Sequence, residues 1–110
     1  MVYDEILTDR VRGLFERKGI ATVEKRMFGG VTFMVRGNMC VGVSRDELMV
    51  RVGKSGNDEA LAQPHARPMN FTGKPKDGFV FVGREGFASD SGLAEWIGRG
   101  LAFNATLPEK

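Results

Sequence analysis

The sequence predicts a single α+β domain, an antiparallel sheet flanked by helices in the order α-β-β-β-β-α-β-β-α. Two observations support this fold class. Amphipathic segments with helical spacing stand near both ends of the chain, and short runs of alternating apolar residues fill the stretch between them. The chain has 110 residues, 42% of them hydrophobic and 27% charged, which is enough to bury one core. No repeat or linker divides it, so we treat residues 1–110 as one domain.

The first helix is expected to begin at Asp4, whose side chain can cap a helix N-terminus. Gly19 is a suitable residue to end it. Between these positions apolar residues recur at helical spacing and predict a buried stripe, while the charged residues lie outside it. The residues of this stripe are Ile6, Leu7, Val11, Leu14 and Phe15.

Four antiparallel strands are expected next, because alternating apolar runs are separated by glycine-containing or polar turns. The Gly37-Asn38 pair predicts a two-residue hairpin turn, and the polar residues 44–47 predict the turn that follows. The four expected strands span residues 23–28, 31–36, 39–43 and 48–52.

The second half of the chain predicts two helices and two more strands. A short helix is expected around residues 57–63, ended by Pro64. Residues 67–78 read as the edge of a strand followed by a loop, and residues 79–82 read as a strand. The closing helix is expected from near Asp90, and its apolar stripe contains Leu93, Trp96, Ile97 and Leu101.

The expected hairpin register places apolar side chains on both faces of the sheet. With a turn at Gly37-Asn38, Met34 opposes Val41 and the two share a face. An antiparallel sheet with one face in water should instead alternate apolar with polar residues. We therefore expect a partner protein, or a second copy of the chain, to cover part of the second face. The alternative is that the last helix or residues 67–78 cover it.

Residues of the sheet are the expected contacts of such a partner. Methionine side chains adapt to varied surfaces, and arginine is enriched at interfaces. The residues expected near the interaction surface are Met34, Cys40, Met49 and Arg51.

Nothing in the sequence predicts catalysis, a cofactor or a metal site. The chain has one cysteine, Cys40, and one histidine, His65, so it can form neither an internal disulfide nor a Cys/His zinc site. A lone cysteine favours a reducing compartment, and we expect the protein in the cytoplasm and away from the membrane. Gly29-Gly30 is read as a turn between strands, because a phosphate loop would lead into a helix.

Binding of a small anion or of nucleic acid is a second, less favoured interpretation. The net charge of +2 neither requires nor excludes an acidic ligand. This interpretation depends on basic residues gathered at one end of the sheet. The residues that would form this cluster are Lys25, Arg26, Arg51 and Lys74.

Several segments, taken in order, resemble the N-terminal domain of TfoX/Sxy proteins. They are Lys25-Arg26-Met27-Phe28-Gly29-Gly30, the hairpin Gly37, the strand Leu48-Met49-Val50-Arg51 and the closing helix around Trp96. The resemblance implies an α+β domain from a bacterial regulator of competence genes that acts with a transcription activator and not as an enzyme. It supplies no catalytic residues. Because the sequence ends at Lys110, we expect a stand-alone domain without the C-terminal domain of the full-length regulators.

Overall fold

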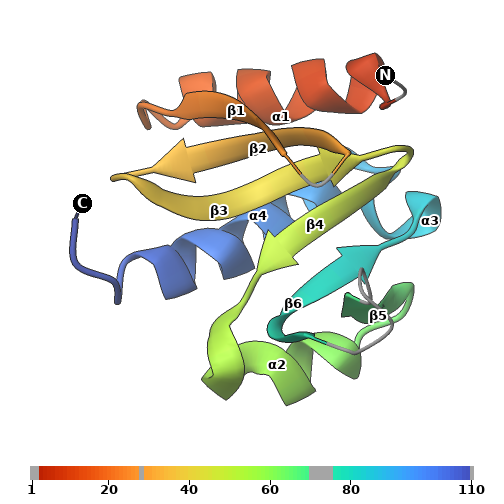
Figure 1. Ribbon diagram of the computed structural model, residues 1–110. Helices are drawn as coiled ribbons and strands as arrows, with labels where there is room; N and C mark the ends of the chain where they lie inside the picture. The colour runs from red at the N-terminus through yellow and green to blue at the C-terminus, as the bar shows by residue number, and fades with distance from the viewer. Residues whose placement is uncertain (1–2, 28, 70–75, 110) are drawn as a thin grey trace.

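The computed structural model describes residues 3–27, 29–69 and 76–109. They form an α+β fold in which six strands build one sheet and two long helices lie against one of its faces (Figure 1). The elements are α1 (Glu5–Arg17), β1 (Val23–Met27), β2 (Gly30–Val35), β3 (Asn38–Ser44), β4 (Glu47–Arg51), α2 (Gly53–Leu61), β5 (Ala66–Met69), β6 (Lys76–Val82), α3 (Arg84–Phe87) and α4 (Asp90–Asn104).

The strands follow the order β1-β2-β3-β4-β6-β5, and every neighbouring pair is antiparallel. β1 and β5 are therefore the two edge strands. This arrangement confirms the predicted fold class and the predicted order of its main elements. The structure adds α3, a short helix between β6 and α4 that the sequence pattern did not indicate.

α1 begins and ends as predicted. The Asp4 side chain accepts a hydrogen bond from the backbone N–H of Leu7 at 3.0 Å, and Gly19 follows the helix with a φ of 70°. Four of the five predicted apolar residues are buried, but Ile6 is 76% exposed. The prediction for Ile6 was wrong because Leu7, one position further on, faces the sheet and turns Ile6 to solvent.

The turn between β2 and β3 lies one residue earlier than predicted. Arg36 and Gly37 form it, both with positive φ (56° and 80°), and Val35 pairs with Asn38. The Asn104 side chain fixes this register, because its Nδ2 donates to the carbonyl oxygens of Val35 (3.1 Å) and Asn38 (3.3 Å).

A β-bulge between Phe33 and Met34 shifts the register again. As a result Phe33 pairs with Val41, and Met34 pairs with Met39. The β3–β4 register agrees with the prediction, since Val43 opposes Leu48. The predicted membership of the two faces was therefore wrong on β2 relative to β3, because a one-residue shift moves side chains to the opposite face.

One face of the sheet packs against α1 and α4 and forms the main core. Phe15 of α1 stacks on Phe33 of β2 with ring centroids 5.8 Å apart. Trp96 and Ile97 of α4 belong to the same cluster. The sheet residues of this cluster are Val31, Phe33, Val35, Cys40, Val41, Val43, Leu48, Val50, Val80 and Val82.

The other face carries a second, methionine-rich cluster. It consists of Met39, Met49, Met69 and Phe81, none of them more than 7% exposed. Met69 belongs to β5, within the segment 67–78 that the sequence offered as an alternative cover. These four residues therefore need no partner to bury them, which corrects the expectation that this part of the sheet is left for another protein.

The remaining helices complete the fold near the sheet ends. α2 begins at Gly53, earlier than predicted, and lies beside β6 and β5. α4 begins as predicted, capped by the Ser89 side chain, which accepts from the N–H of Gly92 at 3.0 Å. None of the helices within the described ranges has the length and apolar character that crossing a lipid bilayer requires.

Candidate functional site

The structure places two of the four predicted contact residues inside the molecule. Cys40 and Met49 are both 0% exposed. Burial raises the pKa of the Cys40 thiol to about 12, so the thiol is protonated at neutral pH. Cys40 is therefore neither a surface contact nor an activated nucleophile in this conformation, and Met49 is part of the core.

The other two predicted contact residues lie at the border of the methionine-rich cluster. Met34 is partly buried against it. The guanidinium carbon of Arg51 lies 5.5 Å from the Phe79 ring centroid and 5.4 Å from that of Phe103. Arg51 is thus held between two aromatic rings, a packing that stabilises the junction of β4, β6 and the end of α4.

The predicted basic cluster does not form among the residues that the structure describes. Lys25 and Arg26 lie on the edge strand β1, whereas Arg51 lies on β4, about 14 Å away across β2 and β3. The register also places Arg26 and Arg51 on opposite faces of the sheet. Lys74 lies outside the described residues.

The Gly29-Gly30 step has a structural role. Gly29 has a φ of 72°, which favours glycine, and Met27 pairs with Gly30 across the turn. A Cβ atom on Gly30 would lie 1.7 Å from the carbonyl oxygen of Val43, so only glycine allows β2 to approach β3 here. A strand follows this step and not a helix, which removes the basis for a phosphate loop.

His65 lines a small cavity of about 270 Å³ together with the carboxylates Glu85 and Glu95. This is the arrangement that would favour an enzyme, if the three groups were joined by hydrogen bonds. Glu95 instead lies 3.5 Å from Arg99, and Ser89 in the same cavity caps α4. Within the described ranges no hydrogen bond joins His65 to either carboxylate, and no group of three acidic, His or Cys side chains could hold a metal ion.

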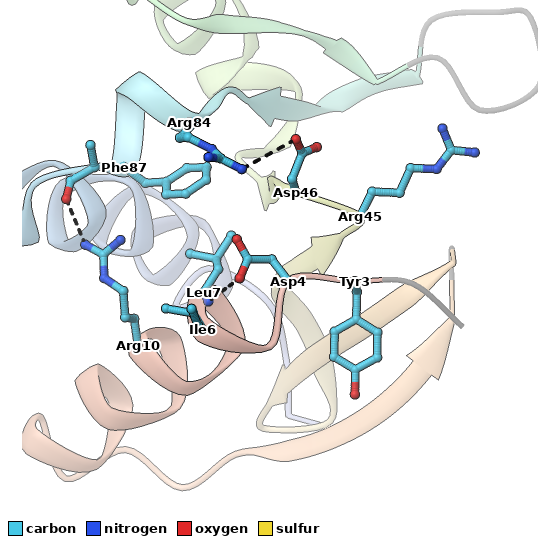
Figure 2. Close-up of a pocket in the computed structure, with 10 residues that line it drawn as sticks. Tyr3, Asp4, Ile6, Leu7, Arg10, Arg45, Asp46, Arg84 and Phe87 are labelled. Carbon is cyan, nitrogen blue, oxygen red and sulfur yellow. Dashed lines mark hydrogen bonds and ion pairs between the residues drawn. The ribbon is translucent and has the colours of Figure 1, made fainter.

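A larger cavity, of about 760 Å³, opens between the start of α1, the β3–β4 turn and α3. We call it the α1–α3 groove. Figure 2 shows Ile6 and Leu7 on one side of it and Phe87 facing them from α3. Leu7 and Phe87 are buried, 1% and 3% exposed, whereas Ile6 is the most exposed large hydrophobic residue among those described.

Backbone contacts and one side-chain contact hold the walls of the groove together. Tyr3 forms a parallel β-bridge with Arg45, and the N–H of Asp4 donates to the Arg45 carbonyl oxygen at 2.6 Å. Across the groove, Arg10 of α1 donates to the carbonyl oxygen of Ala88 at 3.3 Å. The groove is therefore a formed surface feature whose walls come from three separate segments.

The rim of the groove carries charges of both signs. A terminal guanidinium nitrogen of Arg84 lies 3.9 Å from the Asp46 carboxylate. The two side chains are 71% and 66% exposed, so this ion pair is loose and solvated. Arg10 also contacts Asp90, at 3.3 Å. In Figure 2 the Arg45 side chain points away from the groove. An incoming group can therefore displace the Arg84–Asp46 pair at little cost.

The sequence pattern did not reveal this groove. Its lining residues come from positions 3–10, 45–46 and 84–88, which only the fold brings together. The one signal in the sequence was the pair Ile6-Leu7, two adjacent apolar residues about 100° apart around the helix, of which the structure buries only Leu7.

A family model described as TfoX N-terminal domain matches residues 17–104. The match begins at the end of α1, so the α1 wall of the groove precedes it. No curated protein and no solved structure matches the chain.

Proposed function

The chain belongs to the TfoX N-terminal domain family, and on that premise we propose that it is a non-catalytic protein-interaction module. The family is linked in general to the regulation of competence. The partner-binding surface that we propose is the α1–α3 groove, which takes a segment of another protein. It replaces the buried sheet residues Cys40 and Met49 as the expected point of contact.

The exposure of Ile6 is the observation that supports this proposal most strongly. Ile6 is 76% exposed beside the buried side chains of Leu7 and Phe87. Covering an isoleucine side chain typically contributes about 1.5–3 kcal/mol. An apolar side chain from a partner that enters the groove would bury Ile6 and extend the core outward through Leu7 and Phe87.

The rim indicates the rest of the partner's chemistry. Arg84 and Asp46 offer one donor group and one acceptor group at the mouth of the groove, and both are exposed. A segment with an apolar centre and polar groups on either side fits such a mixed rim. This pattern, an apolar anchor surrounded by polar contacts, is the usual arrangement of a protein–protein interface.

A non-catalytic role is consistent with the state of the reactive side chains. The Cys40 thiol is buried and has a raised pKa. His65 is exposed and has no hydrogen bond to Glu85 or Glu95 among the described residues. A cytoplasmic location, favoured by the lone cysteine, and a role in regulating gene expression belong to the same proposal.

Site-specific photo-crosslinking tests the proposal. A photoreactive residue at position 6 should capture a partner in lysate of the source cells, whereas the same residue at Glu16, exposed on α1 away from the groove, should not. Excess unlabelled wild-type chain should suppress the capture, and the Ile6→Asp chain should not. Equal capture from both positions, or equal competition by both chains, would contradict docking in the groove.

A further inference from the structure

Among the residues that the structure describes, no strand covers the outer edge of β1. β1 pairs there only with β2, and all five of its residues are exposed, Val23 by 60% and Met27 by 37%. Its free edge presents backbone N–H and C=O groups that can pair with another strand. The opposite edge strand, β5, contains Pro68, which lacks an N–H and is less suited to pairing.

The side chains of β1 divide between the two faces of the sheet. Glu24 and Arg26 point to the helix-covered face. There Glu24 forms an ion pair with Arg12, and the guanidinium carbon of Arg26 lies 5.9 Å from the Tyr3 ring centroid. The alternation of a strand then directs Val23, Lys25 and Met27 to the methionine-rich face.

We propose that β1 binds the β1 strand of a second copy of this chain, antiparallel, about a two-fold axis at Lys25. An axis perpendicular to the sheet keeps each face continuous with the same face of the other copy. Glu24 then opposes Arg26 of the other copy, and Val23 opposes its Met27, each pair occurring twice. The strand is thus complementary to itself in charge and in apolar character.

The alternative registers are less favourable. Because opposed residues must point to the same face, the register shifts in steps that move the axis by one residue, and a shift to Val23 or Met27 leaves only one residue of each β1 strand opposed. The two remaining registers have the axis at Glu24 and at Arg26. The first places Glu24 opposite Glu24, and the second places Arg26 opposite Arg26. Like charges directly opposed across strands are destabilising. Only the register centred on Lys25 opposes unlike charges on the helix-covered face.

The same register predicts a weak association. It places Lys25 opposite Lys25 at the axis, the one unfavourable pair. Five residues of strand on each side also make an interface smaller than that of stable dimers. The pair therefore forms at high concentration, and Lys25 sets its strength.

Sedimentation equilibrium of wild type and three variants tests the register directly. Lys25→Thr removes the repulsion and should tighten self-association about 2- to 5-fold, whereas the matched Lys18→Thr, exposed beyond α1, should not. Lys25→Glu alone should associate as weakly as wild type. Mixed with wild type, it should form a heterodimer about 3- to 10-fold tighter than either homodimer, because Lys25 then opposes a carboxylate.

Two results would overturn the proposal. One is that wild type and Lys25→Thr both stay monomeric up to ~1 mM. The other is self-association that Lys25→Thr and the mixture leave unchanged, which would place the contact elsewhere. Ile6→Asp should not affect this association, so the result is independent of the groove.

Discussion

Arg12 of α1 and Glu24 of β1 form a two-point ion pair. The Arg12 Nε lies 2.6 Å from Oε2 of Glu24, and one terminal nitrogen lies 2.7 Å from Oε1. This geometry joins the first helix to the edge strand. Hydrogen bonding from Arg12 lowers the pKa of Glu24 below its ordinary value of 4.5, although partial burial opposes the shift.

The pair predicts a specific pH dependence of stability. A lowered folded-state pKa means that the stabilisation is complete above the unfolded pKa of Glu24 and is lost as the pH falls through the folded value. Because both side chains are partly exposed, Glu24→Gln should lower the free energy of unfolding by only about 0.5–1 kcal/mol at pH 7. This loss of unfolding free energy should become smaller toward pH 3, because Glu24 is then increasingly protonated in wild type as well. Urea unfolding at both pH values measures it, with the exposed Glu16→Gln as the control; a loss that does not depend on pH would contradict the assignment.

A second prediction concerns Asn104, which fixes the β2–β3 hairpin. Its side chain is 2% exposed and donates to two backbone carbonyl oxygens. Asn104→Ala should lower the free energy of unfolding by about 1–3 kcal/mol, because it leaves these acceptors without their donor. Asn104→Asp should cost more, since a carboxylate would face two carbonyl oxygens. Urea unfolding compares the three chains, and an aspartate variant as stable as wild type would refute this role.

The hairpin shows how far the sequence allowed the fold to be predicted. Alternating apolar residues correctly indicated β2, β3 and β4, because that pattern is local. Gly37-Asn38 has the composition of a hairpin turn, yet the turn uses Arg36-Gly37. Asn104, 66 residues after Asn38 in the chain, selects this register, and a local pattern cannot show such a contact.

The groove and the two sheet faces were beyond prediction for the same reason. The β-bulge, which leaves Cys40 of β3 without a partner on β2, places Met39 on the same face as Met49, where both pack with Met69 and Phe81. The sequence offered residues 67–78 as one possible cover, but that Met69 of β5 packs with these residues could be seen only in the folded sheet. Likewise Ile6, Asp46 and Phe87 meet only in the folded chain.

Cys40 should be unreactive while the chain is folded. With a pKa of about 12 in place of 9.0, its thiolate fraction is roughly 1000-fold lower than that of an exposed thiol, and burial also blocks access. Labelling with a disulfide reagent at pH 8 should therefore be slow in buffer and fast in concentrated urea. Rapid labelling of the folded protein would show that Cys40 is accessible, and would reopen a chemical role for it.

Quantitative titration of the partner captured at position 6 tests the central claim most directly. Ile6→Asp should weaken binding at least about 10-fold, since loss of a buried apolar anchor typically costs more than 1 kcal/mol. Val23→Asp, which changes the other strongly exposed apolar residue, on β1, should bind like wild type. Equal affinity of Ile6→Asp and wild type, with both chains folded, would show that the α1–α3 groove is not the binding site.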